Sequence, residues 1–215
     1  MTSNNLKQVL SPARLSTYEN YVGGDTDKAL NLYLWNANIS GSFLPCLHIC
    51  EVSMRNAVSE ALTNVHGSDW PWKQRFLQSL PNPGGHSYSP RKNLESVSPK
   101  HKTVGKVIPE MNFVFWQTLF TRRHDDRIWN SQLKSILPFL PAGEIKDLRK
   151  DIYEDLEAVR KLRNRIAHHE PIFTRNLHDD LNKIKRLVGY RCSYSQHWLS
   201  LHEKVTATLD EKPAR

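Results

Sequence analysis

The residues best suited to chemistry gather in one short stretch, which runs Arg-Lys-Leu-Arg-Asn-Arg-Ile-Ala-His-His-Glu-Pro over positions 160–171. Within it, Arg163, Asn164 and His168 combine a permanent cation, an amide and an imidazole that titrates near neutrality. This set suits the binding of a phosphodiester and the movement of a proton at it. Basic residues also collect at helix C-termini because they complement the helix dipole, so a surface basic cluster is the alternative.

The helical period predicts how these side chains lie around the end of one long helix. At about 100° per residue, Arg163 falls inside an apolar stripe, and Asn164 and His168 follow on its edge. Arg165 and His169 fall on the other side. Because an unpaired charge within an apolar stripe is costly, we expect Arg163 to have an anionic partner, either a carboxylate or a bound phosphate. The stripe consists of Ile152, Leu156, Val159, Leu162, Ile166 and Ala167.

The composition is that of a basic globular protein. The 215 residues, 39% apolar and 24% charged, suffice for a hydrophobic core, and we expect a single domain over residues 1–215. A formal net charge of +8 favours a polyanionic partner such as nucleic acid. No apolar run approaches the roughly 20 residues that span a bilayer, and the first residues lack the apolar core of a signal peptide. We therefore expect a cytoplasmic protein with no membrane partner.

The three cysteines predict neither a disulfide framework nor a metal site. They are few and odd in number, as is typical of a reducing compartment. Cys46, His48 and Cys50 have a ligand-like spacing, but two cysteines one turn apart are more often core positions. A zinc site of this type would also need a fourth ligand. We expect no metal and no cofactor.

Helical patterns cover nearly the whole chain and predict an all-α bundle. Ser11 and Pro12 form an N-cap and first-position pair. Pro45 is compatible with a helix only in its first turn, which favours a break just before it. The expected helices are about 12–22, 26–40, 42–66, 129–140, 142–169, 175–188 and 193–209, with flexible ends at about 1–10 and 210–215.

Two segments before the motif helix differ from the rest in composition. Residues 81–99 carry four prolines and two glycines, and we expect a loop-rich insertion over about 81–105. Residues 108–120 are the most aromatic part of the chain, and their pattern fits either a helix or a buried strand-like segment. Trp70, Trp72 and Trp116 could stack nucleic-acid bases, although packing in the core is favoured.

The motif resembles that of a known family. The residues from Arg163 to His168 resemble the Arg-x4–6-His signature of the HEPN superfamily. The wider phrase over 162–170, followed by Phe173, is closest to the Abi-like (abortive infection) branch of that superfamily.

Two upstream elements extend the resemblance to about residues 40–175. Glu51-Val-Ser-Met-Arg55-Asn56 resembles the Glu-x-x-x-Arg-Asn element of the Abi-like branch. Residues 112–120, with a tryptophan following at 129, resemble its aromatic Phe-Trp segment, although the residues at 112 and 114 are larger than expected there.

The resemblance implies an α-helical bundle that dimerises along the motif helix, with two Arg–His corners facing each other across a cleft. It also implies a metal-independent endoribonuclease, a hydrolase often used as a toxin in antiviral defence. RNA cleavage by the adjacent 2′-hydroxyl needs an acid or base with a pKa near neutrality and a cation at the phosphorane oxygens. The implied partners are an RNA substrate, a second copy of the chain and an antitoxin made of protein or RNA.

The same resemblance suggests a role for each residue of the corner. His168 is expected as the general acid or base, and His169 is its rival because it gives the longer spacing from Arg163. His169 otherwise belongs to the expected substrate-binding set. Arg163 would hold the scissile phosphate. Asn164 would orient His168 or hold the substrate.

Supporting roles fall to residues nearby in the expected fold. Arg160 and Arg165 are expected to add phosphate affinity without sequence specificity. Glu51 is expected as a buried carboxylate that holds Arg163 or Arg55 in place.

Two other functions remain open at this point. One is a non-catalytic helical dimerisation module that binds RNA or a nucleotide at the basic corner. The other is a purely structural interaction protein whose motif helix forms a dimer seam.

Overall fold

The computed structural model describes residues 3–214, with side chains described from residue 5 onward. Every regular element in this part of the chain is helical, which confirms the all-α prediction. Flexible ends were expected at about 1–10 and 210–215, and of these segments residues 1–2 and 215 lie outside the described residues. Most of the first segment forms a helix instead.

The helices are α1 (Ser3–Leu10), α2 (Pro12–Tyr21), α3 (Thr26–His66), α4 (Gln74–Ser79), α5 (Pro90–Val97), α6 (Val104–Val107), α7 (Phe113–Thr118), α8 (Asn130–Ile136), α9 (Ile145–Ala167), α10 (Leu177–Arg191), α11 (Ser193–His202) and α12 (Val205–Asp210). Shorter helical turns lie between them: η1 (Trp70–Trp72), η2 (Ser98–Lys100), η3 (Ile108–Glu110), η4 (Arg122–His124) and the π-helical turn η5 (Asp125–Trp129).

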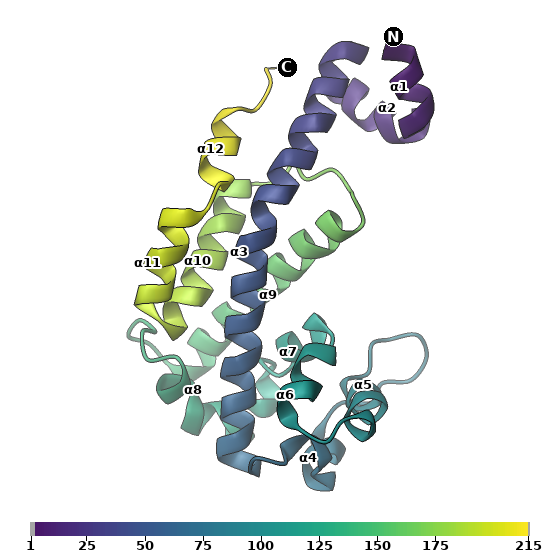
Figure 1. Cartoon of the computed structure of the whole chain (residues 1–215). Coiled ribbons are helices and arrows are strands. Elements are labelled where there is room, and N and C mark those ends of the chain that lie inside the picture. The colour runs from purple at the N-terminus through teal and green to yellow at the C-terminus, as the bar shows by residue number, and fades with distance from the viewer. Residues whose placement is uncertain (1–2, 215) are drawn as a thin grey trace.

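One helix, α3, runs the length of the molecule (Figure 1). Its 41 residues correspond to about 60 Å at 1.5 Å per residue. Asp25 caps its start, because one carboxylate oxygen accepts the N–H groups of Asp27 and Lys28 at 3.0 Å each. The break expected between residues 40 and 42 is wrong, and Pro45 lies inside the helix rather than in its first turn.

The continuous helix follows from its continuous buried face. Ile39, Phe43, Cys46 and Leu47 are all buried, on both sides of the expected break. Packing of this face against the rest of the bundle overrides the local cost of a proline inside a helix.

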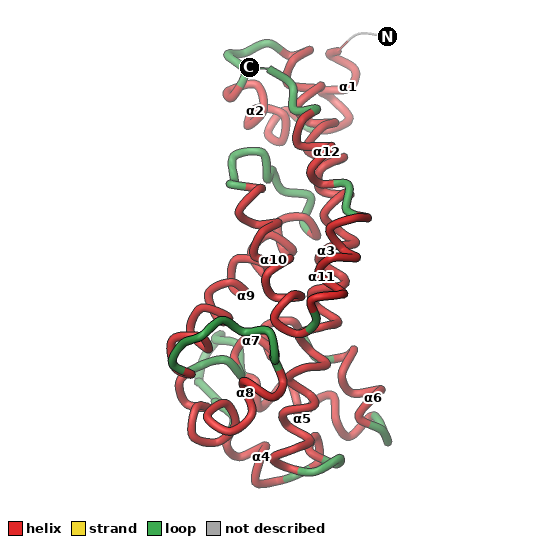
Figure 2. Tube along the Cα trace, turned by 90° about the vertical axis from the view of Figure 1, so that its left-hand side faces the viewer, coloured by secondary structure: helices red, strands yellow, loops and turns green. Residues whose placement is uncertain are grey.

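The other helices group around the two ends and the middle of α3. Helices α1, α2 and α12 lie at its beginning, and α4 to α8 surround its end (Figures 1 and 2). Helices α9, α10 and α11 lie along its middle. The beginning of α9 lies beside the α4–α8 group, and the helix leads from there toward the middle of α3 (Figure 1).

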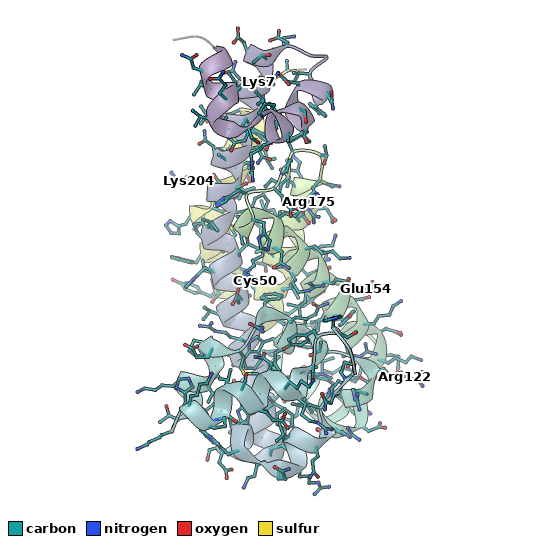
Figure 3. All side chains as sticks on the ribbon, turned by 90° about the vertical axis from the view of Figure 1, so that its right-hand side faces the viewer. Lys7, Cys50, Arg122, Glu154, Arg175 and Lys204 are labelled. Carbon is teal, nitrogen blue, oxygen red and sulfur yellow. The ribbon has the colours of Figure 1, made fainter. Side chains whose placement is uncertain are left out.

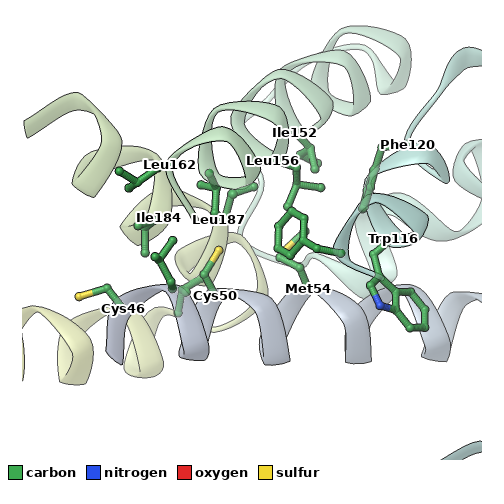
Figure 4. Packing of buried hydrophobic residues seen from close by; sticks show 14 of the residues in the cluster. Cys46, Cys50, Met54, Trp116, Phe120, Ile152, Leu156, Leu162, Ile184 and Leu187 are labelled. Atoms are coloured by element: carbon green, nitrogen blue, oxygen red, sulfur yellow. The ribbon is translucent and has the colours of Figure 1, made fainter. Parts of the chain in front are cut away.

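The core between α3 and α9 is apolar. Cys46, Cys50 and Met54 of α3 face Leu156 and Leu162 of α9 together with side chains of α10 (Figure 4). Both cysteines are 0% exposed and free, which confirms that they are core positions. Burial raises the pKa of the Cys46 thiol to about 11 and raises that of Cys50 further.

Ion pairs hold the first half of α9 in place. Arg149 donates from Nε to a carboxylate oxygen of Asp125 at 2.9 Å and from Nη1 to the carbonyl of Phe120 at 3.1 Å. Asp155, which is buried, accepts two hydrogen bonds from Arg186 of α10 at 2.8 and 2.7 Å. These contacts connect α9 to η5 and to α10.

Several expected boundaries are corrected by the structure. The loop expected over 81–105 is wrong for Pro90–Val97, which forms α5 with Ser89 as its N-cap. The aromatic segment 108–120 contains helix α7 rather than a strand-like segment. The helix expected over 193–209 is two helices, because the chain turns at Glu203 between α11 and α12.

Side chains that end in nitrogen or oxygen project along the whole outside of the molecule, with Lys7 near one end and Arg122 on the side of the opposite half (Figure 3). Along residues 3–214, no helix combines the length and the apolar character needed to cross a membrane.

Candidate functional site

The C-terminal end of α9 closes with a left-handed residue. The N–H of His169 donates to the carbonyl of Ile166 at 3.0 Å, and the N–H of Glu170 donates to that of Arg165 at 2.8 Å. These two bonds form a Schellman motif. His169 takes the position that glycine usually occupies, with φ 55°, so the chain keeps an imidazole here at the cost of some backbone strain.

Two other helices fix the turn that follows. Arg14 of α2 donates from Nη1 to the carbonyl of His169 at 2.6 Å. Asn36 of α3, which is buried, accepts the N–H of Ile172 at 2.8 Å. The turn after α9 is thus held from two sides, and both histidines stand on a fixed backbone.

Arg163 is exposed and has no hydrogen bond or ion pair within the described part of the chain. It lines a surface hollow of about 590 Å³ on α3, together with His48 and Glu51. No carboxylate oxygen of the described residues lies within 4.0 Å of its guanidinium. The expected carboxylate partner is thus absent from the described residues. Arg163 is also exposed rather than enclosed by the apolar stripe, so the cost of an unpaired buried charge, from which a partner was expected, does not apply to it. The other residues of this hollow are Gly41, Leu44, Pro45 and Leu47.

Glu51 differs from the expectation in the same way. Its side chain is half-buried rather than buried. Among the described residues it forms no ion pair within 4.0 Å, neither with Arg163 nor with Arg55. Nε of Arg55 is buried without a hydrogen-bond partner in the described part of the chain. The supporting role expected for this pair is thus not visible as a direct contact.

The two flanking arginines both have protein partners. Arg160 donates from Nε to Oε1 of Gln117 on α7 at 2.6 Å, and Gln117 is only 2% exposed. Arg165 pairs with Glu170 at 3.1 Å on the surface. Of the three motif arginines, Arg163 alone is left without a partner among the described residues.

His169 lines a second hollow, of about 390 Å³, with Tyr18, Tyr33 and Asn36. Burial, followed by the charge of Tyr33, raises the pKa of the Tyr18 phenol to about 12, so this hydroxyl stays protonated at neutral pH. The Tyr18 ring is nearly buried and packs against Tyr33 and Phe173, so it forms the floor of this hollow.

The two hollows adjoin. Gly41 and Leu44 of α3 are wall residues of both. Arg163 lies beside residues 41–51 of α3, and His169 lies beside residues 36–44, so α9 runs antiparallel to α3. We call the pair of hollows the α3–α9 groove.

His168 and Asn164 meet through the backbone. The N–H of His168 donates to the carbonyl of Asn164 at 3.0 Å. His168 is exposed and Asn164 is half-buried. Within the described residues neither side chain makes a hydrogen bond, so a bond by which Asn164 would orient His168 is absent from this part of the chain.

The structure thus brings Arg163, Glu51 and His169 to one groove, whereas His168 is exposed and lines neither hollow. It adds His48 and the two tyrosines, which the motif does not contain. His48 lies one helical turn before Glu51, so the helical period could have placed it on the same face. Nothing in the sequence could have placed Tyr18 beside His169, because the two are far apart in the chain.

Within residues 3–214, no three His, Cys, Asp or Glu side chains are grouped as the ligands of a metal ion would be. The groups that line the groove are a guanidinium, a carboxylate, imidazoles and phenols.

No protein-family model, no curated protein and no solved structure matches this chain. The resemblance to the HEPN superfamily therefore stays a prediction from the motif residues.

Proposed function

We propose that this protein is a metal-independent endoribonuclease of the HEPN, Abi-like type, acting as a toxin in abortive infection. The observation that supports this most is the state of Arg163: an exposed guanidinium without a protein partner in the described chain, in a hollow with His48. His168 and His169 follow it in the next turn. A cation without a carboxylate partner, with one imidazole in the same hollow and another in the adjoining hollow, is suited to an RNA phosphate.

Arg163 would bind the scissile phosphate. As the 2′-oxygen attacks phosphorus, negative charge grows on the non-bridging oxygens, and a guanidinium stabilises that charge. Arg160 and Arg165 are tied to Gln117 and Glu170, so they would contribute to the electrostatic attraction of RNA more than to the bond-breaking step.

Two imidazoles would carry the protons. One accepts the proton of the 2′-hydroxyl as the bond between the 2′-oxygen and phosphorus forms. The other donates a proton to the 5′-oxygen as its bond to phosphorus breaks. The products are a 2′,3′-cyclic phosphate and a 5′-hydroxyl, and no oxidant or metal enters the balance.

Three histidines compete for these two roles. His168 is the acid or base that the motif spacing favours. His169 lies in the adjoining hollow with the tyrosines, and His48 shares the hollow of Arg163. A second copy of the chain, docked along α9, would bring a second set of the same groups to a shared cleft, and an antitoxin would cover it.

The test is cleavage of labelled tRNA and mRNA by the purified protein, with and without EDTA. We expect cleavage that EDTA does not abolish, with 2′,3′-cyclic phosphate ends. Replacing Arg163 or the true acid or base with alanine should reduce the rate by a factor on the order of 10² to 10⁴. Alanine variants of His48, His168 and His169, made one at a time, identify the proton carriers.

Matched controls separate chemistry from general charge. Arg122→Ala removes an exposed arginine of the α4–α8 group, and His197→Ala removes an exposed histidine of α11; both should cleave like the wild type. Cleavage that requires a metal, or an Arg163→Ala variant as fast as Arg122→Ala, would refute the proposal. Tight RNA binding with no cleavage would favour the non-catalytic binding module instead.

A further inference from the structure

A second basic hollow lies at the other end of α3, away from the α3–α9 groove. It has a volume of about 580 Å³ and is lined by parts of α3, α4, η4 and η5. Its wall residues are Val65, His66, Arg75, Gln78, Ser79, His124, Asp126, Arg127 and Ile128. None of them belongs to the motif, and the proposed ribonuclease chemistry uses none of them.

His124 is the unusual residue of this hollow. Its side chain is only 1% exposed, yet both ring nitrogens are buried without a hydrogen-bond partner in the described part of the chain. A buried imidazole normally satisfies at least one nitrogen. The ring forms part of the wall of the hollow. Both nitrogens lie just beneath its surface, so a ligand accepts a hydrogen bond from the ring once the neighbouring side chains move aside. The π-helical turn η5 begins directly after it, and such turns are frequent at functional sites.

The charges around the hollow favour an anion. Arg75 has no hydrogen bond or ion pair within the described chain. Arg127 donates only to the backbone carbonyl of Ser79, at 3.4 Å. The single carboxylate, that of Asp126, already accepts a hydrogen bond from Asn130 at 2.9 Å. Two arginines and one carboxylate therefore line this space, and two imidazoles line it as well.

We propose that this hollow is a second anion site, which binds the phosphate group of a phosphate monoester. Arg75 and Arg127 would bind the phosphate oxygens, and His124 would donate from its unsatisfied ring nitrogen. Val65 and Ile128 form an apolar wall against which a sugar or base can lie. The volume is within the usual range for small-molecule sites and leaves room for a nucleoside beside the phosphate.

The phosphate can come from a free nucleotide or from the end of an RNA strand, because both carry the same group. The test is isothermal titration of the full chain with inorganic phosphate, AMP and adenosine at low salt. We expect phosphate and AMP to bind and adenosine, which lacks the phosphate, not to bind. To test the end of an RNA strand as the source of the phosphate, two RNA strands are titrated into the Arg163→Ala variant. The strands differ only at the 5′ end, which carries a phosphate in one and a hydroxyl in the other.

Matched variants locate the site. Arg75→Gln should weaken AMP binding by roughly ten-fold or more, since a charge-assisted hydrogen bond is lost. Arg122→Gln removes an equal charge from a residue outside the hollow and should change the affinity less than about two-fold. His124→Gln should weaken AMP binding as Arg75→Gln does. If His124→Gln unfolds the protein because His124 is buried, Arg75→Gln still tests the site, since Arg75 is exposed.

NMR of the histidine side chains gives an independent measurement. Inorganic phosphate should shift the imidazole signals of His124 and His66 and leave that of His197 unchanged. Absence of phosphate and AMP binding, or equal effects of Arg75→Gln and Arg122→Gln, would overturn the proposal. In the Arg163→Ala variant, AMP should still bind at this hollow, and adding Arg75→Gln should weaken that binding. Failure of the ribonuclease proposal and failure of this one are therefore separate outcomes.

Discussion

The two ends of α9 hold their arginines in opposite ways. At its beginning, Arg149 is nearly buried and is bound by both Asp125 and the carbonyl of Phe120. At its end, Arg163 is exposed and has no partner in the described chain. One helix therefore carries a cation used to fix its position and a cation left available for a ligand.

This difference shows that a basic residue within a motif has to be judged by its partners. Arg149 supports η4 and η5, and so it holds the backbone that carries His124. Arg163 supports nothing in the described chain. Net charge and spacing do not distinguish the two arginines. Their contacts do, because Arg149 is held by protein partners and Arg163 has none in the described chain.

The largest expected effect is a contrast in stability between these two arginines. Arg149→Ala leaves the carboxylate of Asp125 poorly solvated and unpaired, and should lower the free energy of unfolding by about 3 kcal/mol. Arg163→Ala should change it by less than about 0.5 kcal/mol, because its side chain is exposed. Urea denaturation of both variants measures the contrast, and equal losses would show that Arg163 is also structural.

The second prediction concerns pH and the turn that Arg149 supports. Burial, followed by the charges of Arg123, Arg127 and His66, lowers the pKa of His124 to about 4. The unfolded chain binds this proton near pH 6.5, so the folded state binds fewer protons between these values. The stability contribution is fully present above about pH 6.5 and is lost as the pH falls toward about 4.

The size of this pH effect is roughly 3 kcal/mol for a shift of this extent. Urea denaturation at several pH values, in wild type and in His124→Gln, isolates it from the titration of the carboxylates. The wild type should lose more stability on acidification than the variant. Equal pH dependence in the two proteins would mean that His124 is not desolvated as described.

The smallest expected effect is at the other end of α9 and has the opposite sign. His169 occupies a left-handed position with φ 55°, where glycine carries no penalty from a side chain. His169→Gly removes the cost of a left-handed residue with a side chain but adds the conformational entropy of glycine, so it should raise the free energy of unfolding by about 0.5 to 1 kcal/mol. If this imidazole carries a proton in RNA cleavage, the same variant should be more stable and less active. A loss of stability would contradict the assigned backbone strain.

The motif helix was the part of the fold that the sequence predicted best. Its apolar stripe and its end near Pro171 follow from helical periodicity, and α9 matches the expected span to within a few residues. Burial of Cys46 and Cys50 was also predicted, because both lie on an apolar helical face. These features depend on local spacing alone.

The failures arise where packing at a distance decides the structure. A break was expected before Pro45, but the apolar face on both sides packs on the same partners and the helix continues. Ser89 and Pro90 form the same kind of start signal as Ser11 and Pro12, yet the surrounding prolines and glycines concealed helix α5. In the second hollow, His66 and His124 meet only through the fold.

The proline inside α3 has a consequence for recognition. Pro45 carries no N–H, so the carbonyl oxygen of Gly41, four residues earlier, has no donor at the usual helical position. Both residues line the hollow of Arg163, and nothing from elsewhere in the described chain lies within 4 Å of where a Cβ on Gly41 would stand. A main-chain acceptor therefore stands at the same surface as a cationic donor. Such a wall discriminates in favour of ligands that present a hydroxyl or amino group close to a negative charge, as a ribonucleotide does.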